Sequence, residues 1–186
     1  MEAFSDGVLA IIITIMVLEL SIPTRATPDA LLPLIPKLSS YILSFVFLGI
    51  YWNNHHHLLQ VVEHVNGRVL WANLHLLFWL SLTPFVTGWM GETHFAKWPV
   101  AAYGVVLLCA AIAYTILTVS LLRLHGQDST LAAAMGRDWK GKLSIVLYVI
   151  AVPSSMVHPA IAGGLYVLVA LMWLVPDRRV ERVVMR

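Results

Sequence analysis

Residues 1–20, MEAFSDGVLAIIITIMVLEL, form a hydrophobic stretch that carries polar side chains where a simple membrane anchor would not need them. Ser5 and Asp6 stand near its start, and Thr14 interrupts a run of isoleucines. A carboxylate at the edge of lipid is costly, so Asp6 is expected to contact protein rather than acyl chains. The stretch therefore predicts a membrane helix with two chemically different faces.

The positions of these residues around a helix separate the two faces. At about 100° per residue, Ile15 and Leu18 fall within about 40° of Ile11, and Thr14 lies about 60° from it. Asp6 falls on the opposite side, at about 220° from Ile11. One face thus carries branched apolar side chains with a single hydroxyl, and the other begins with a carboxylate.

The composition of the whole chain places it in a bilayer. Of its 186 residues, 59% are hydrophobic and 12% are charged, and the mean hydropathy is +0.80. Soluble domains carry about 25% charged residues. The net charge of +2 is spread over scattered basic residues, so no nucleic-acid partner is expected. Cys109 is the single cysteine, which excludes an intrachain disulfide and a cysteine-based metal site.

Six apolar stretches approach the ~20 residues that a helix needs to cross the hydrocarbon core. They predict an all-α integral membrane protein, a single six-helix domain over residues 1–186. The spans are predicted at residues 4–22, 38–59, 69–90, 100–122, 143–158 and 160–175. The polar segment 123–142 is predicted to be a connecting loop with a short amphipathic helix, and the sequence MVHPAIAGG (156–164) a tight hairpin.

Basic residues predict the orientation, because cytoplasmic loops carry an excess of Lys and Arg. With the N-terminus inside, nine basic residues fall on the cytoplasmic side and three on the other. The three are Arg25, Lys37 and Lys97. We therefore expect a multi-pass protein of the cell membrane with both termini in the cytoplasm.

Polar residues on three predicted spans lie at similar membrane depth. Trp52 and His55 are one turn apart near the end of the second span, and Asn73 begins the third. Ser5 and Asp6 begin the first. These five side chains are predicted to form a hydrogen-bond network that joins three helices.

The histidine run at residues 55–57 raises the question of a metal site. Consecutive helical residues diverge by about 100°, so three adjacent histidines cannot converge on one ion. A site would need His55 or His57 to pair with His64 or His75, and no helical His-xxx-His motif supports that arrangement. No metal and no cofactor are therefore expected.

Three motifs in order resemble the transmembrane protein 175 family, the lysosomal potassium channels of animals and their prokaryotic relatives. They are FSDG at residues 4–7, the Trp52 and His55 pair, and Asn73 followed by SLTPF at residues 81–85. The resemblance covers the first ninety residues well. The family motif also places an arginine four residues before the phenylalanine, a position that would precede Met1 here.

The resemblance implies an architecture and a set of pore residues. Prokaryotic members have one six-helix repeat and assemble as tetramers, so this chain is expected to form a homotetramer that conducts potassium ions across the lipid bilayer. The family pore is lined by the first helix and lacks a carbonyl filter. Its narrow apolar point maps onto Ile11, further rings map onto Ile15 and Leu18, and a threonine linked to potassium preference maps onto Thr14.

The distribution of polar residues also favours a channel over a transporter or an enzyme. Only Asp6 and Glu19 of the ten acidic residues touch a predicted span, whereas a proton-coupled carrier generally needs ionisable groups at mid-membrane depth. A channel is therefore the first hypothesis, and a secondary ion or metal transporter is the alternative. No enzyme is expected, because no acidic pair, His–Glu zinc motif or nucleophile motif occurs at matching depth.

Overall fold

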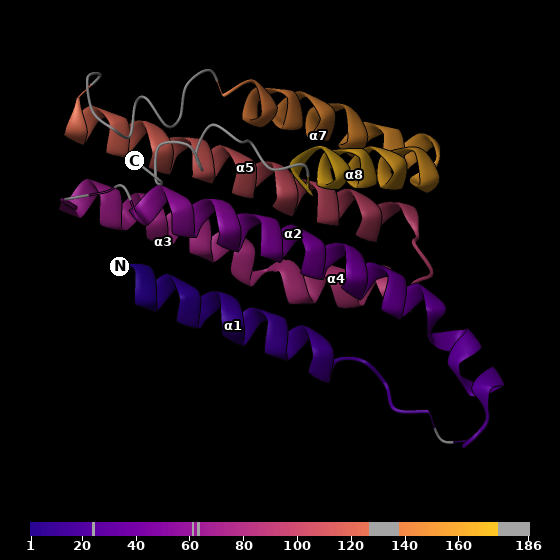
Figure 1. The fold of residues 1–186 in the computed structure, drawn as a ribbon. Helices are drawn as coiled ribbons and strands as arrows, with labels where there is room; N and C mark the ends of the chain where they lie inside the picture. Colours follow the sequence, from indigo (N-terminus) through magenta and orange to yellow (C-terminus); the bar gives the residue numbers. More distant parts are fainter. Residues whose placement is uncertain (24, 61, 63, 127–137, 175–186) are drawn as a thin grey trace.

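The computed structural model describes residues 1–23, 25–60, 62, 64–126 and 138–174, and within them every regular element is helical. The all-α class predicted from the sequence is confirmed for this part of the chain. The helices run side by side along a common direction (Figure 1). They are α1 (Glu2–Leu18), the 3₁₀ segment η1 (Pro28–Leu34), α2 (Ile35–Gln60), α3 (Gly67–Ser81), α4 (Thr83–Glu92), α5 (Lys97–His125), α7 (Trp139–Val157) and α8 (Pro159–Leu174).

Four helical stretches are long and apolar enough to cross a membrane: Pro28–Gln60, Gly67–Glu92, Lys97–His125 and Trp139–Val157. The chain is therefore a membrane protein. Helix α8 is a shorter apolar helix of 16 residues, and α1 has 17. At 1.5 Å per residue, 17 residues reach only about 26 Å. Six crossings per chain stay a prediction.

The first helix is shorter than the span predicted for residues 4–22. It ends at Leu18. The Leu20 amide donates a hydrogen bond at 3.2 Å to the carbonyl of Val17, three residues earlier, as in a 3₁₀ turn. Pro23 disfavours helical backbone at Ile22, so a helix that reaches residue 22 is unfavourable.

The stretch predicted as one span at 69–90 is divided into α3 and α4. Only Leu82 separates them. Pro84 lacks an amide hydrogen, and its ring disfavours a straight continuation past the carbonyl four residues earlier, so the helix restarts at Thr83. At its beginning, α3 is capped by the Asn66 side chain, which accepts a hydrogen bond from the Val69 amide at 3.0 Å.

The turn between α7 and α8 is as tight as the sequence predicts. His158 alone separates the two helices, and Pro159 occupies the first position of α8. The glycines of the MVHPAIAGG segment, Gly163 and Gly164, lie inside α8 rather than in the turn. The segment 123–142, predicted as a loop with a short amphipathic helix, is helical at both ends, because α5 continues to His125 and α7 begins at Trp139. Its residues 127–137 lie outside the described ranges.

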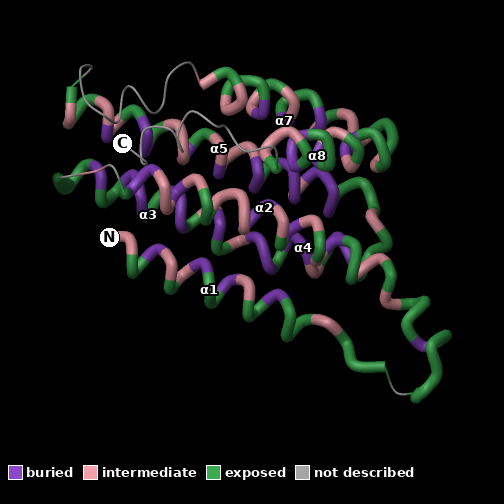
Figure 2. Tube along the Cα trace, viewed as in Figure 1, coloured by how far each residue is buried: buried purple, intermediate pink, exposed green. Residues whose placement is uncertain are grey.

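Two apolar clusters form the core, and α5 contributes to both. The first joins α1, α2, α3 and α5, and the second joins α2, α4, α5, α7 and α8. Helix α1 lies at the margin of the bundle and packs against α2, α3 and α4 (Figure 1). Buried and exposed residues alternate along it (Figure 2), so one side of α1 faces the core and the other faces away.

Candidate pore helix and its polar support

One side of α1 is packed into the protomer. Leu9, Ile12 and Met16 are each no more than 3% exposed, and they belong to the first core cluster with residues of α2, α3 and α5. Their spacing of three and four residues is that of one helical face. This packing fixes which side of α1 is turned away from the protomer.

The predicted pore residues lie on the unpacked side. Ile11 is 61% exposed, Ile15 is 43% exposed and Leu18 is 77% exposed, and Thr14 is exposed as well. The structure therefore leaves all four side chains available to a surface outside the protomer.

The exposed side also contains a regular seam. Phe4, Gly7, Ile11, Thr14 and Leu18 are all exposed and follow one another at intervals of three, four, three and four residues. This average spacing of 3.5 residues is the one by which helices pack around a shared axis. A helix that only faced lipid would not need a repeat of this kind.

The Thr14 hydroxyl is oriented by its own helix. Its Oγ1 donates a hydrogen bond to the Ala10 carbonyl at 2.8 Å. Because the single hydroxyl proton is used in this bond, the oxygen lone pairs remain as acceptors on the exposed side. An oxygen in this state can replace part of the hydration shell of a cation.

Three of the five predicted network residues form a buried hydrogen-bond chain. Asn73 Oδ1 lies 2.7 Å from His55 Nε2, and Asn73 Nδ2 donates to Ser5 Oγ at 2.9 Å. Ser5 Oγ in turn donates to the Met1 carbonyl at 3.2 Å. All three side chains are at most 2% exposed. The chain joins α1, α2 and α3 at the end of the bundle where α1 begins, which we call the amino end.

The direction of these bonds assigns the histidine tautomer. Asn73 Oδ1 can only accept, so the proton that it receives must be on His55 Nε2. His55 Nδ1 is then the unprotonated nitrogen, and it is buried without a hydrogen-bond partner.

Asp6 and Trp52 lie outside this chain, unlike the sequence prediction. Asp6 Oδ1 is shielded from solvent but has no hydrogen-bond partner. Trp52 is 45% exposed and stacks on the His56 ring, with 5.6 Å between the ring centroids. The reason is angular, because neighbours such as Ser5 and Asp6 diverge by about 100° and cannot both face Asn73.

The far end of α1 borders a groove of about 570 Å³ between α1, α2 and α4. The Glu19 carboxylate packs against Gly88 of α4, where an added Cβ would approach its Oε2 to 2.8 Å. Lys37 at the same end forms an ion pair with Glu92 at 2.5 Å and donates a hydrogen bond to Ser21 at 2.9 Å. Glu19 is thus turned towards α4 and away from the exposed seam.

These features define a class of protein: a helical membrane protein in which a peripheral amino-terminal helix presents a regularly spaced, unburied face. Comparison with known proteins gives the family. Residues 1–84 match the family model described as "Endosomal/lysosomal potassium channel TMEM175". A potassium channel of Chryseobacterium sp. (strain P1-3) is 56% identical over 182 residues, which cover 98% of this chain and 95% of that protein. The chain therefore belongs to the TMEM175 family of membrane channels.

Two further relatives place the chain within that family. The crystal structure of a lysosomal potassium-selective channel TMEM175 homologue from Chamaesiphon minutus aligns with a TM-score of 0.79 at 26% identity, covering 93% of this chain and 94% of that one. The endosomal/lysosomal proton channel TMEM175 of Danio rerio is 27% identical over 130 residues, 67% of this chain but 24% of the fish protein. These relatives are channels rather than enzymes.

Proposed function

We propose that the chain forms a potassium-permeable cation channel, a homotetramer in which four copies of α1 surround the conduction path. The unburied seam of α1 is the observation that carries this proposal. Family membership supports it, because the Chryseobacterium relative is a potassium channel. The face that carries Leu9, Ile12 and Met16 is packed into the protomer, so the seam is the side of this helix that is free to face a common axis.

In this arrangement Ile11, Ile15 and Leu18 each form an apolar ring of four side chains. A narrow apolar ring stops conduction by losing its water and permits it when slightly wider. Thr14 adds a ring of four hydroxyl oxygens between the apolar rings of Ile11 and Ile15. These oxygens give a cation preference without a carbonyl filter.

The proposed channel lies in the cell membrane with both termini in the cytoplasm. Basic residues support this orientation, since the loops at the amino end of the bundle carry more of them than the loops at the far end. Arg68 and Arg123 stand at the amino end, and Arg25 and Lys37 at the other.

The test is ion flux through purified protein in liposomes under potassium and sodium gradients. Ile11→Asn is expected to raise the leak and to lower the ratio of potassium to sodium flux, because a polar ring stays hydrated. Val17→Asn is the matched control, since Val17 is 45% exposed on the same helix but lies about 120° around it from Ile11. Equal flux in Ile11→Asn and the wild type, or the same change in both variants, would contradict the proposed pore.

The hydroxyl ring is tested by Thr14→Val, which keeps the shape of the side chain and removes its oxygen. We expect a lower ratio of potassium to sodium flux at a similar total conductance.

A pH-sensitive dye inside the same liposomes measures proton movement. Potassium flux that requires proton exchange would favour a secondary transporter instead. The mass of the purified protein in nanodiscs tests the tetramer independently.

A further inference from the structure

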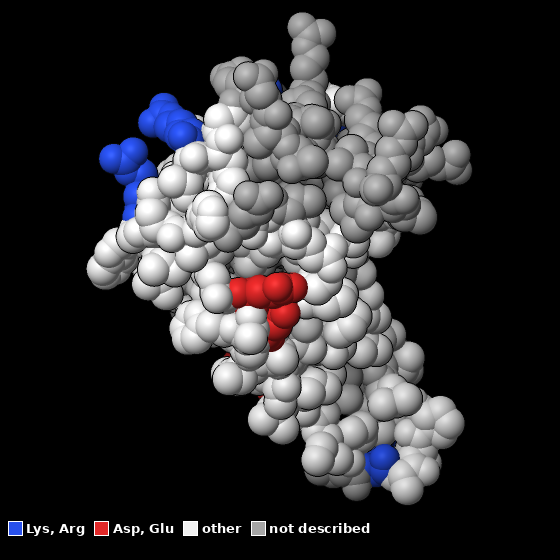
Figure 3. Space-filling model, turned by 60° about the vertical axis from the view of Figure 1, so that its left-hand side comes forward, with Lys and Arg blue, Asp and Glu red and all other residues white. Residues whose placement is uncertain are grey.

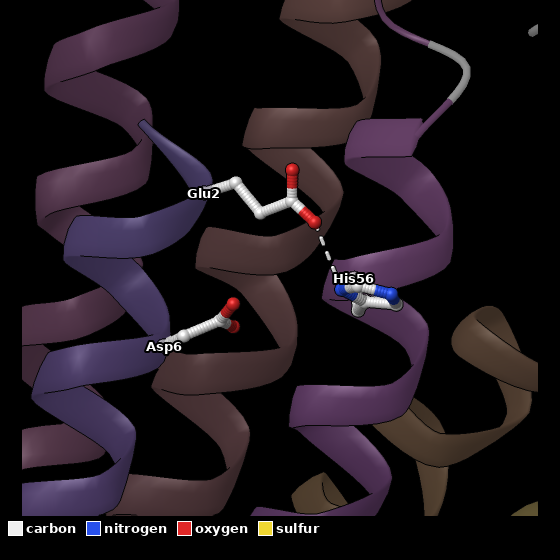
Figure 4. A group of neighbouring side chains, drawn as sticks. All are labelled: Glu2, Asp6 and His56. Carbon is white, nitrogen blue, oxygen red and sulfur yellow. Dashed lines mark ion pairs between the residues drawn. The ribbon is translucent and has the colours of Figure 1, made fainter.

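A second group of polar side chains lies beside the buried hydrogen-bond chain at the amino end. Glu2 and Asp6 project from the same face of α1, because they are four residues apart, and His56 projects towards them from α2 (Figure 4). One ligand atom of each residue lies within 4.8 Å of the other two. Glu2 Oε1 is 2.9 Å from His56 Nδ1. We call these three residues the amino-end triad.

Few of the described groups meet the carboxylates of the triad. Asp6 Oδ1 is shielded from solvent and has no hydrogen-bond partner, an arrangement that costs free energy unless a cation or donor meets the oxygen. Within the described ranges, neither Glu2 nor Asp6 forms an ion pair with Lys or Arg. Figure 3 brings the left-hand side of Figure 1 forward and shows a compact acidic patch surrounded by white atoms, with Lys or Arg side chains only at the margins of the described surface.

A second buried atom at the amino end also lacks a hydrogen-bond partner. His55 is 1% exposed, and its Nδ1 forms no hydrogen bond. The charged groups near enough to interact with His55 are Asp6, Glu2 and His56, the members of the triad. Asp6 Oδ1 and His55 Nδ1 are thus two shielded atoms at the amino end that carry lone pairs and have no hydrogen-bond partner.

The His56 ring is held in place from both sides. Trp52, one turn earlier on α2, stacks on it with an interplanar angle of 22°. Gln60, one turn later, places its amide Nε2 at 2.9 Å from His56 Nε2. A flip of the Gln60 amide turns this contact into a bond from His56 Nε2–H to the Gln60 oxygen, which leaves the Nδ1 lone pair free. Histidines that bind metals commonly have such support on the other ring nitrogen.

We propose that Glu2, Asp6 and His56 bind a divalent transition-metal cation such as Zn²⁺. One imidazole nitrogen and two carboxylate oxygens are a donor set that suits this class of ion, and a water molecule completes the coordination. Donor atoms around a tetrahedral Zn²⁺ are about 3.4 Å apart, given bond lengths of about 2.1 Å. Rotation of the partly exposed Glu2 and Asp6 side chains closes the remaining distance.

The bound ion links α1 to α2 at the end where the candidate pore helix begins. The sequence did not predict it, because His56 pairs with residues that are fifty positions away and not with another histidine. The only local signal is the spacing of Glu2 and Asp6, which alone indicates a solvated helix face.

The proposal is tested by isothermal titration of the purified full chain with Zn²⁺. We expect one site per chain, and a dissociation constant at least tenfold higher in Glu2→Gln and in His56→Gln. His57→Gln is the matched control, because it removes the neighbouring histidine on the same helix and is expected to bind Zn²⁺ as the wild type does. Binding is read without any flux measurement, so its failure is distinguishable from failure of the proposed channel.

Two further measurements guard against misfolded variants. Zn²⁺ should raise the midpoint of thermal unfolding of the wild type and of His57→Gln, because an ion that binds only the folded state stabilises it, and should leave Glu2→Gln unchanged. Bound Co²⁺ should give the visible absorption bands typical of a low coordination number in the wild type. These bands should be absent in His56→Gln. Equal Zn²⁺ affinity in the wild type, Glu2→Gln and His56→Gln, or no binding to the wild type, would overturn the proposal.

Discussion

Asn73→Ala tests whether the buried hydrogen-bond chain holds α1 against the bundle. Asn73 makes two interhelical contacts, at 2.7 Å to His55 and at 2.9 Å to Ser5. Removing its amide leaves the His55 Nε2–H and one Ser5 lone pair buried without partners. Ser5 keeps its hydrogen bond to the Met1 carbonyl, so most of the lost stability comes from the unpaired His55 Nε2–H.

The expected magnitude follows from these groups. A buried donor that loses its partner costs about 1–3 kcal/mol, whereas hydrogen bonds between membrane helices average about 0.6 kcal/mol. Asn73→Ala loses two hydrogen bonds and leaves the His55 Nε2–H as a buried donor without a partner. We therefore expect its free energy of unfolding to decrease by about 2 kcal/mol. For a chain of this size, that corresponds to a decrease of about 4–8 °C in the thermal midpoint.

The assay is thermal unfolding of purified protein in detergent. The folded fraction that remains after heating is measured by size-exclusion chromatography with fluorescence detection. Asn54→Ala is the matched control, because the Asn54 side chain bonds only the Ile50 carbonyl of its own helix, at 2.8 Å. A midpoint for Asn73→Ala no lower than that for Asn54→Ala would refute the reasoning. So would strict additivity of Asn73→Ala with His55→Ala, because residues that interact directly show a coupling energy.

Two glycine substitutions test the packing of the bundle. Gly91→Ala is expected to destabilise the protein by about 1–3 kcal/mol, since its Cβ would lie 2.8 Å from the backbone of Lys37 on α2, whereas Gly49→Ala meets nothing within 4 Å and should be neutral or stabilising in the same unfolding assay. Gly104→Ala would collide with the Tyr166 hydroxyl, and Tyr166→Phe should restore part of the lost stability; no recovery in the double variant would exclude this collision as the cause.

The angular positions of the first twenty residues around their helix could be predicted from the sequence, because helical periodicity is a local property. They separated Ile11 and Leu18 from the side that carries Asp6, and the structure shows the first two unburied. These angular positions alone could not name the partners of the opposite side; the shared membrane depth of Ser5, His55 and Asn73 put them in one predicted network, and the structure joins these three by hydrogen bonds. Ser5 and Asn73 are 68 positions apart in the chain, and they became partners only through packing.

The sequence by itself determined the helical class, the membrane setting and the two-faced character of the first helix, because composition and a period of 3.6 residues need no tertiary information. It also contained the motifs that relate the chain to its family. The tertiary structure decided which polar side chains pair. It left Asp6 and Trp52 out of the hydrogen-bond chain and brought Glu2 to His56, because rotation and depth of packed helices are set by core contacts made along the whole bundle.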